Sequence, residues 1–190
     1  RKMPGQVCVG VGVVVVGSDG SVLLGRRKGA HGSGTWALPG GWLEKNEEFV
    51  ACALRELEEE TGLMPPDLCM ASAEVVPVVA NNVMDKGVHS VTVFVRVPLR
   101  VGEAADKVRV CEPEKCHEWR WVQPSAAMLA PGQAKRTEPL FPPLEHLVAS
   151  EYWRDTVLAG RRTKQLLSGL PCVLMGAGLG FAAAMLVVRR

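Results

Sequence analysis

Four glutamates lie within eight residues of one short segment, Arg55 to Gly62, which reads RELEEETG. If this segment is helical, Glu56, Glu59 and Glu60 stand at positions i, i+3 and i+4, so their carboxylates gather on one face. Like charges at this spacing destabilise an isolated helix, and the helix dipole disfavours anions near the C-terminal end. The pattern therefore predicts a compensating positive charge beside the helix, unless the acidic face is simply solvated.

A hard divalent cation can supply that charge. Mg²⁺ binds oxygen ligands, and it usually combines a few carboxylates with waters and substrate phosphates. We therefore expect Glu56, Glu59 and Glu60 to hold Mg²⁺, with Mn²⁺ as an alternative, against a phosphate-containing substrate. Arg55 precedes these acids directly, so we expect it to form ion pairs within the site rather than to bind substrate.

The helix that carries these acids is predicted from about residue 48 to residue 61. Its apolar stripe would face the core, and Gly62 followed by Pro65-Pro66 would end it. The stripe consists of Val50, Ala53, Leu54, Leu57 and Thr61.

The remaining chain predicts strands before and after this helix. A hairpin joins residues 7–16 to residues 21–27 through Asp19-Gly20, and a glycine-rich loop follows over residues 28–41. Further strands are expected at 73–83, 89–99 and 116–122, the last with Trp119 and Trp121 on one side, and a second helix at 142–153. Strands on both sides of a helix favour an α/β fold in which helices cover a mixed sheet.

The spacing around the acidic helix is specific. Gly41 is followed by five residues, then Glu47, then seven residues, and then Arg55-Glu56-Leu57-x-Glu59-Glu60-x-Gly62-Leu63. This pattern resembles the Nudix box, G-x5-E-x7-R-E-U-x-E-E-x-G-U with U aliphatic, at all nine of its fixed positions. The resemblance implies an α/β/α sandwich with a mixed sheet over residues 1–150.

The same resemblance implies roles for individual residues. Glu56, Glu59 and Glu60 match the family's metal ligands and catalytic acids, and Glu47 matches the first glutamate, which supports the metal site. Arg55 matches the structural arginine, and Gly41 and Gly62, with Gly40, match the loop glycines. Which glutamate takes the proton from the attacking water stays open. Glu112 and Glu114 are candidates for an extra acid from outside the box, although solvated loop charges are the alternative.

The flanking segments, GRRKGAHGSGTWALPGGWLE and EPEKCHEWRWV, are similar to those of MutT-type nucleoside-triphosphate diphosphatases within the Nudix family. The similarity implies hydrolysis of ordinary or oxidised nucleoside triphosphates, such as 8-oxo-dGTP, or of dihydroneopterin triphosphate, to a monophosphate and diphosphate. The alternatives are a pyrophosphatase for NADH, ADP-ribose or nucleotide sugars, and a Nudix module that binds without cleaving. The positions matching the group's substrate pocket are Arg27, Trp36, Leu38, Thr92 and Phe141.

The end of the chain has a different composition. Residues 169–188 carry no charge, and 20 helical residues span about 30 Å, the thickness of the hydrocarbon core of a bilayer. Basic residues flank this segment, so we expect a C-terminal transmembrane anchor, joined by a helical or linker segment at 151–168. The protein would then face the cytosol or stroma from an unidentified membrane, or be cytoplasmic if the tail does not insert.

The formal net charge is +2, which gives no reason to expect a nucleic-acid polymer as partner. Gly176 and Gly180 form a GxxxG pattern, which can pack two helices together. The proteins that this chain resembles also commonly dimerise, so a homodimer is possible. The six cysteines have neither zinc-site nor CxxC spacing, and we expect them to be reduced thiols.

Overall fold

The structure is a computed structural model, and it describes residues 6–29, 31–84, 88–100, 103–124 and 139–158. Its centre is a seven-stranded mixed sheet with the order β3-β2-β1-β6-β5, in which β4 also pairs with β1 and β7 with β2. The strands are, in chain order, β1 (Val7–Val16), β2 (Val22–Arg27), β3 (Trp36–Ala37), β4 (Gly40–Trp42), β5 (Glu74–Met84), β6 (Val88–Pro98) and β7 (Cys116–Val122).

β1 organises the sheet because it pairs with three other strands. It runs parallel to β6 over its whole length, from Val7 opposite His89 to Val16 opposite Pro98. The middle of the strand also pairs antiparallel with β4, and its end begins the predicted hairpin with β2. The continuous valine run of β1 fits this central position, since strands covered on both faces read as unbroken apolar segments.

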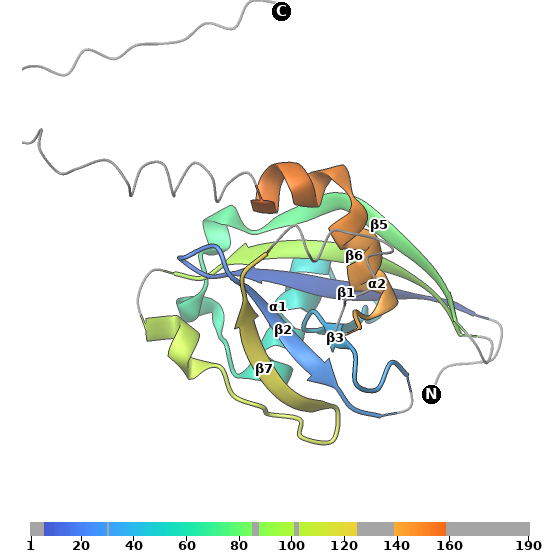
Figure 1. The fold of residues 1–190 in the computed structure, drawn as a ribbon, viewed down its shortest axis with the longest axis horizontal. Helices are drawn as coiled ribbons and strands as arrows, with labels where there is room; N and C mark the ends of the chain where they lie inside the picture. Colours follow the sequence, from blue (N-terminus) through green and yellow to red (C-terminus); the bar gives the residue numbers. More distant parts are fainter. Residues whose placement is uncertain (1–5, 30, 85–87, 101–102, 125–138, 159–190) are drawn as a thin grey trace, which may run out of the picture.

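Helices cover both faces of the sheet, which confirms the α/β class (Figure 1). On one face lies α1 (Phe49–Thr61), above a core that includes Val13, Leu57 and Val95. On the other lie α2 (Pro142–Ala149) and the π-helical turn η6 (Trp153–Leu158), around Phe94 and Leu144.

The ends of α1 agree with the sequence prediction to within one residue. Glu48 is the N-cap, and Gly62 ends the helix in the left-handed region, at φ +74°, with its N–H donating to the carbonyl of Glu58. Only glycine adopts this conformation without steric cost, so the box glycine has a structural role at this position.

Two predicted elements differ from the structure. The glycine-rich stretch expected to be a loop contains β3 and β4, which are only two and three residues long and carry no readable alternation. The helix predicted over 142–153 stops at Ala149 because Ser150 is extended, with ψ 158°, and its hydroxyl accepts a hydrogen bond from the N–H of Trp153 (3.2 Å).

The predicted anchor at residues 169–188 lies outside the described residues, as does most of the segment 151–168. Among the helices that the structure describes, none is both long and apolar enough to cross a bilayer.

Candidate active site

The acidic face of α1 packs against the glycines of β4. The backbone N–H of Gly40 donates to Oε2 of Glu60 (3.0 Å). The carboxylate of Glu56 fills the space beside Gly41 where any other residue would carry its Cβ. The box glycine thus allows a buried carboxylate to lie directly against the backbone of β4.

Arg55 binds the acids around it. Its Nε and Nη2 atoms donate to the two carboxylate oxygens of Glu47 (2.8 and 3.0 Å), a bidentate pair. Its Nη1 atom lies 2.8 Å from Oε1 of Glu56 and 3.5 Å from Oε2 of Glu59. Hydrogen bonding to Arg55 lowers the pKa of Glu47 to about 2, so this carboxylate stays charged. Arg55 thereby ties the loop before α1 to the acidic face.

Two acids of the cluster lie in surroundings that disfavour their charged forms. Burial raises the pKa of Glu60 to about 7, with the neighbouring carboxylates of Glu56 and Glu112 adding to the rise. Burial also raises the pKa of Glu56, although its bond to Arg55 acts in the opposite direction. A bound cation would reverse these shifts, because it favours the charged form of each carboxylate.

A loop from another part of the chain adds Glu112 to this environment. The N–H of Cys111 (3.1 Å) and Nε1 of Trp119 (3.2 Å) both donate to the carbonyl of Glu60 and hold the loop at the end of α1. Oε1 of Glu112 pairs with Nζ of Lys115 (2.6 Å), whereas its Oε2 is buried without a hydrogen-bond partner among the described residues. Glu114, the other candidate from this loop, is exposed.

The side chains of this cluster are of the type that binds a divalent cation, but they are not oriented around a common metal position. No group of three or more His, Cys, Asp or Glu side chains within the described ranges is arranged to hold a metal ion as it stands. Glu56 and Glu59 instead point to Arg55, and the side chain of Glu59 is half exposed. The donors are nevertheless all carboxylates, which suits Mg²⁺, and the orphaned oxygen of Glu112 calls for a partner. The assignment of Glu56, Glu59, Glu60 and Glu47 to a metal site therefore stays a prediction.

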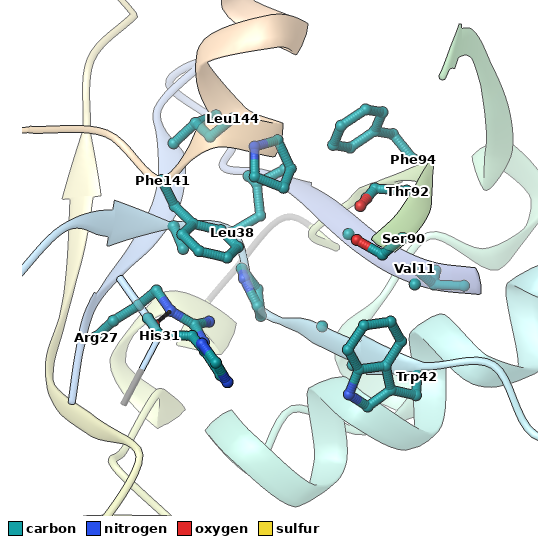
Figure 2. A pocket seen from close by; sticks show the side chains of 17 residues that line it. Val11, Arg27, His31, Leu38, Trp42, Ser90, Thr92, Phe94, Phe141 and Leu144 are labelled. Atoms are coloured by element: carbon teal, nitrogen blue, oxygen red, sulfur yellow. Dashed lines mark hydrogen bonds between the residues drawn. The ribbon is translucent and has the colours of Figure 1, made fainter. Parts of the chain in front are cut away.

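A pocket of about 210 Å³ opens on the other side of β4. Its lining includes Gly40 and Gly41, so the acids and the pocket meet at the same backbone. Arg27 and His31 lie at one side, with Ser90, Thr92 and Phe94 along the opposite wall (Figure 2).

Four of the five residues expected in a substrate pocket line this one: Arg27, Leu38, Thr92 and Phe141. The guanidinium of Arg27 stacks on the ring of Phe141, 4.3 Å from its centroid, and its Nε donates to the carbonyl of His31 (3.2 Å). Burial lowers the pKa of Arg27, and the charge of Glu60 acts in the opposite direction.

Trp36, the fifth expected residue, is not part of the pocket lining. Its side chain is only 3% exposed and packs in the core beside Leu140 and Leu144, with the guanidinium of Arg120 4.7 Å from the centroid of its ring. β3 pairs with β2 and also bridges to Leu140, and these contacts fix Trp36 in the interior.

The sequence interpretation missed several residues of the pocket. His31, Trp42, Ser90 and Phe94 all line it. Ser90 and Phe94 could have been found, because they alternate with Thr92 on one face of β6. His31 and Trp42 could not, since a loop and a three-residue strand give no periodicity.

Comparison with known proteins agrees with this geometry. The NUDIX domain model matches residues 7–143. The RNA pyrophosphohydrolase of Novosphingobium aromaticivorans is 30% identical over 141 residues, which cover 64% of this chain and 80% of that protein. The ADP-ribose pyrophosphatase of Methanocaldococcus jannaschii is 41% identical, but over 51 residues, 27% of this chain and 30% of that protein.

Solved structures show the same fold. A MutT NUDIX hydrolase from Burkholderia pseudomallei has a TM-score of 0.52 at 29% identity, over 70% of this chain and 92% of that one. A MutT/nudix family protein from Enterococcus faecalis has a TM-score of 0.61 at 19% identity, over 88% of this chain and 70% of that one, and is evidence for the fold alone.

The chain belongs to the Nudix family. It is accordingly an enzyme of the class that hydrolyses phosphorus-containing anhydrides, a class that generally uses divalent metals such as Mg²⁺.

Proposed function

We propose that this protein hydrolyses nucleoside triphosphates, including oxidised ones such as 8-oxo-dGTP or dihydroneopterin triphosphate, to a monophosphate and diphosphate. The observation that carries the proposal is the shared backbone of Gly40 and Gly41. On one side it contacts the buried acids Glu60 and Glu56, and on the other it lines the pocket. A base in the pocket would therefore extend its phosphates toward the acids.

Mg²⁺, or Mn²⁺ in its place, would neutralise charge on the phosphoryl oxygens and make water a better nucleophile. Glu56, Glu59 and Glu60 are the residues we assign to hold it, with Glu112 as an additional ligand because its Oε2 is free of partners among the described residues. Arg55 and Glu47 keep α1 in place by their bidentate pair. Water then adds across the anhydride between the α- and β-phosphates, and one carboxylate of the cluster accepts its proton.

We assign Arg27 to bind the negatively charged phosphates of the substrate. Its guanidinium is held by the ring of Phe141 and by the carbonyl of His31, and the negative charge of Glu60 favours its charged form. An arginine preorganised in this way can bind phosphate oxygens with little further loss of conformational freedom.

The test compares three Glu→Gln variants of helix α1. We expect Glu56→Gln and Glu60→Gln to lower kcat/KM at least about 100-fold, because each removes a charge from the cation site. Glu58→Gln is the matched control, since Glu58 is exposed on the same helix. A circular dichroism melt checks that each variant is folded. If the two site variants bind nucleotide and turn over as Glu58→Gln does, the residue assignment is wrong; if the unmodified chain hydrolyses nothing, the binding-module alternative stands.

A second candidate is removal of diphosphate from a triphosphorylated RNA 5′ end. It is favoured by the 30% identical relative, which is named an RNA pyrophosphohydrolase and is covered over 80% of its length. Both substrates present the same anhydride, so the acids do not separate them. Initial rates on a panel of nucleoside triphosphates, a 5′-triphosphate oligoribonucleotide, NADH and ADP-ribose decide between the candidates. The main proposal fails if no free triphosphate outranks the other substrates.

A further inference from the structure

Asn82 is a buried polar residue to which the proposed reaction gives no role. It lies on β5 with 6% of its surface exposed, next to the wall of the pocket that β6 forms. In the antiparallel register, Asn82 is opposite Ser90 and Ala80 is opposite Thr92. Ser90 and Thr92 are the two hydroxyl residues of the wall, and both oxygens face the pocket (Figure 2).

The surroundings of Asn82 fix which end of its amide faces Thr92. The Nδ2 atom lies 3.2 Å from the carbonyl oxygen of Ala80 and 3.5 Å from that of Ser90. Carbonyl oxygens only accept hydrogen bonds, so the donating nitrogen must stand at this position rather than the amide oxygen. The same nitrogen lies 3.1 Å from Oγ1 of Thr92. The threonine oxygen therefore acts as the acceptor in this contact.

This contact leaves the hydroxyl of Thr92 with a hydrogen to donate. A hydroxyl has one hydrogen and two lone pairs, and Asn82 engages one lone pair, so the hydrogen remains for another partner. No other hydrogen bond of the Thr92 hydroxyl is formed within the part of the chain that the structure describes. Its side chain borders the pocket beside Phe94 and opposite Leu38, where an unpaired donor is costly.

We propose that Asn82 is a positioning residue that makes Thr92 a hydrogen-bond donor, so that the pocket selects nucleobases presenting a carbonyl oxygen to this wall. The inference rests on the proposed function, because it takes the ligand to be a nucleotide whose base enters the pocket. An exocyclic amino group at the same place could use only the remaining lone pair of this oxygen and would leave the hydroxyl hydrogen without an acceptor. Hypoxanthine and adenine form the sharpest pair, since they carry a carbonyl and an amino group at the same ring position.

Binding of IMP and AMP to the full chain tests the proposal by isothermal titration calorimetry. Neither nucleotide has an anhydride to hydrolyse, so failure of the proposed hydrolysis, measured separately, does not affect the result. We expect IMP to bind at least about tenfold more tightly than AMP, consistent with one gained hydrogen bond and one avoided unpaired donor. Thr92→Val should bring the ratio close to one, and Thr92→Ser should keep it.

The role of Asn82 is read from a double-mutant cycle. Asn82→Ala should lower the IMP preference in the unmodified background and have no further effect on it in the Thr92→Val background, because Asn82 acts through that hydroxyl. Asn81→Ala is the matched control: Asn81 is the next residue of β5, it is exposed, and its Oδ1 contacts Nε2 of His89 (2.8 Å). Equal binding of IMP and AMP, no binding of either, or an Asn82→Ala effect that persists without the Thr92 hydroxyl would overturn the proposal. Should Asn82→Ala fail to fold, the Thr92→Val and Thr92→Ser pair still decides it.

Discussion

Gly41 has no side chain to place, and the carboxylate of Glu56 occupies the vacant volume. We expect Gly41→Ala to displace Glu56 and to lower kcat/KM at least about tenfold, as loss of support for a metal ligand does. The backbone of Gly41 is not in the left-handed region, so alanine adds bulk there without adding backbone strain. Steady-state kinetics over a range of Mg²⁺ concentrations measure the effect, which should include a weaker apparent affinity for Mg²⁺. Turnover within about twofold of the unmodified enzyme would contradict this account.

At the scale of residues, the sequence showed the types and spacing of the acids, but it did not predict how their side chains are oriented. The nine positions of the box placed Glu56 and Glu60 on one face of α1, next to Gly40 and Gly41. Arg55 was expected to pair with acids of the site, but the carboxylates it contacts and the bond of Glu60 to the backbone of Gly40 depend on how β4 packs, and no spacing rule gives them. Trp36 illustrates the same limit, because an aromatic residue next to a binding loop can face either the pocket or the core.

Among the elements, two segments that follow α1 are joined by an ion pair between a buried aspartate and an exposed lysine. Oδ1 of Asp67, at the end of η1 (Pro65–Asp67), accepts from Nζ of Lys107 (2.5 Å), at the end of η4 (Glu103–Lys107). Oδ2 of Asp67 also accepts from the N–H of Met64 (3.1 Å). The pair with Lys107, more than the bond to Met64, lowers the pKa of Asp67 below its ordinary 3.8.

This pair should make stability depend on pH in the acid range. A carboxyl whose pKa is lower in the folded than in the unfolded chain stabilises the fold above the unfolded pKa, and the contribution is lost as the pH falls through the folded value. We therefore expect Asp67→Asn to reduce the free energy of unfolding by about 1–2 kcal/mol at pH 7 and by clearly less near pH 3. Urea unfolding at both pH values measures the difference. Lys107→Met is the companion variant, and a gap between Asp67→Asn and the unmodified chain that is equally large at pH 3 would argue against the pair.

The elements themselves were predictable where they were long and periodic. β1, β6, β7 and α1 lie where the alternation, the apolar run or the helical stripe indicated. β3 and β4 were not predicted, because such short strands are determined by pairing with other strands and carry no local sequence signal. These two strands carry residues of the pocket, so part of the pocket lining had no local sequence signal.

At the scale of the whole molecule, the residues of the site all precede the charge-free segment 169–188 in the sequence. All residues that line the pocket lie between Gly10 and Leu144, and the acids lie on α1 and the loop that carries Glu112. The described part of the chain ends at Leu158, before the charge-free segment 169–188. The chemistry and the predicted membrane attachment should therefore be separable.

Removing residues 161–190 should leave kcat/KM within about twofold, because no residue of the site is lost. The full chain and the shortened chain are then compared by flotation with vesicles of neutral phospholipid. Twenty uncharged residues are enough to span the hydrocarbon core, so we expect the full chain to float with the vesicles and the shortened chain to remain in the dense fraction. Neutral lipid excludes attraction of the flanking basic residues to anionic headgroups as the cause. A full chain that stays in the dense fraction would show that the anchor prediction is wrong, and a shortened chain that is folded but inactive would show that residues beyond 160 support the site.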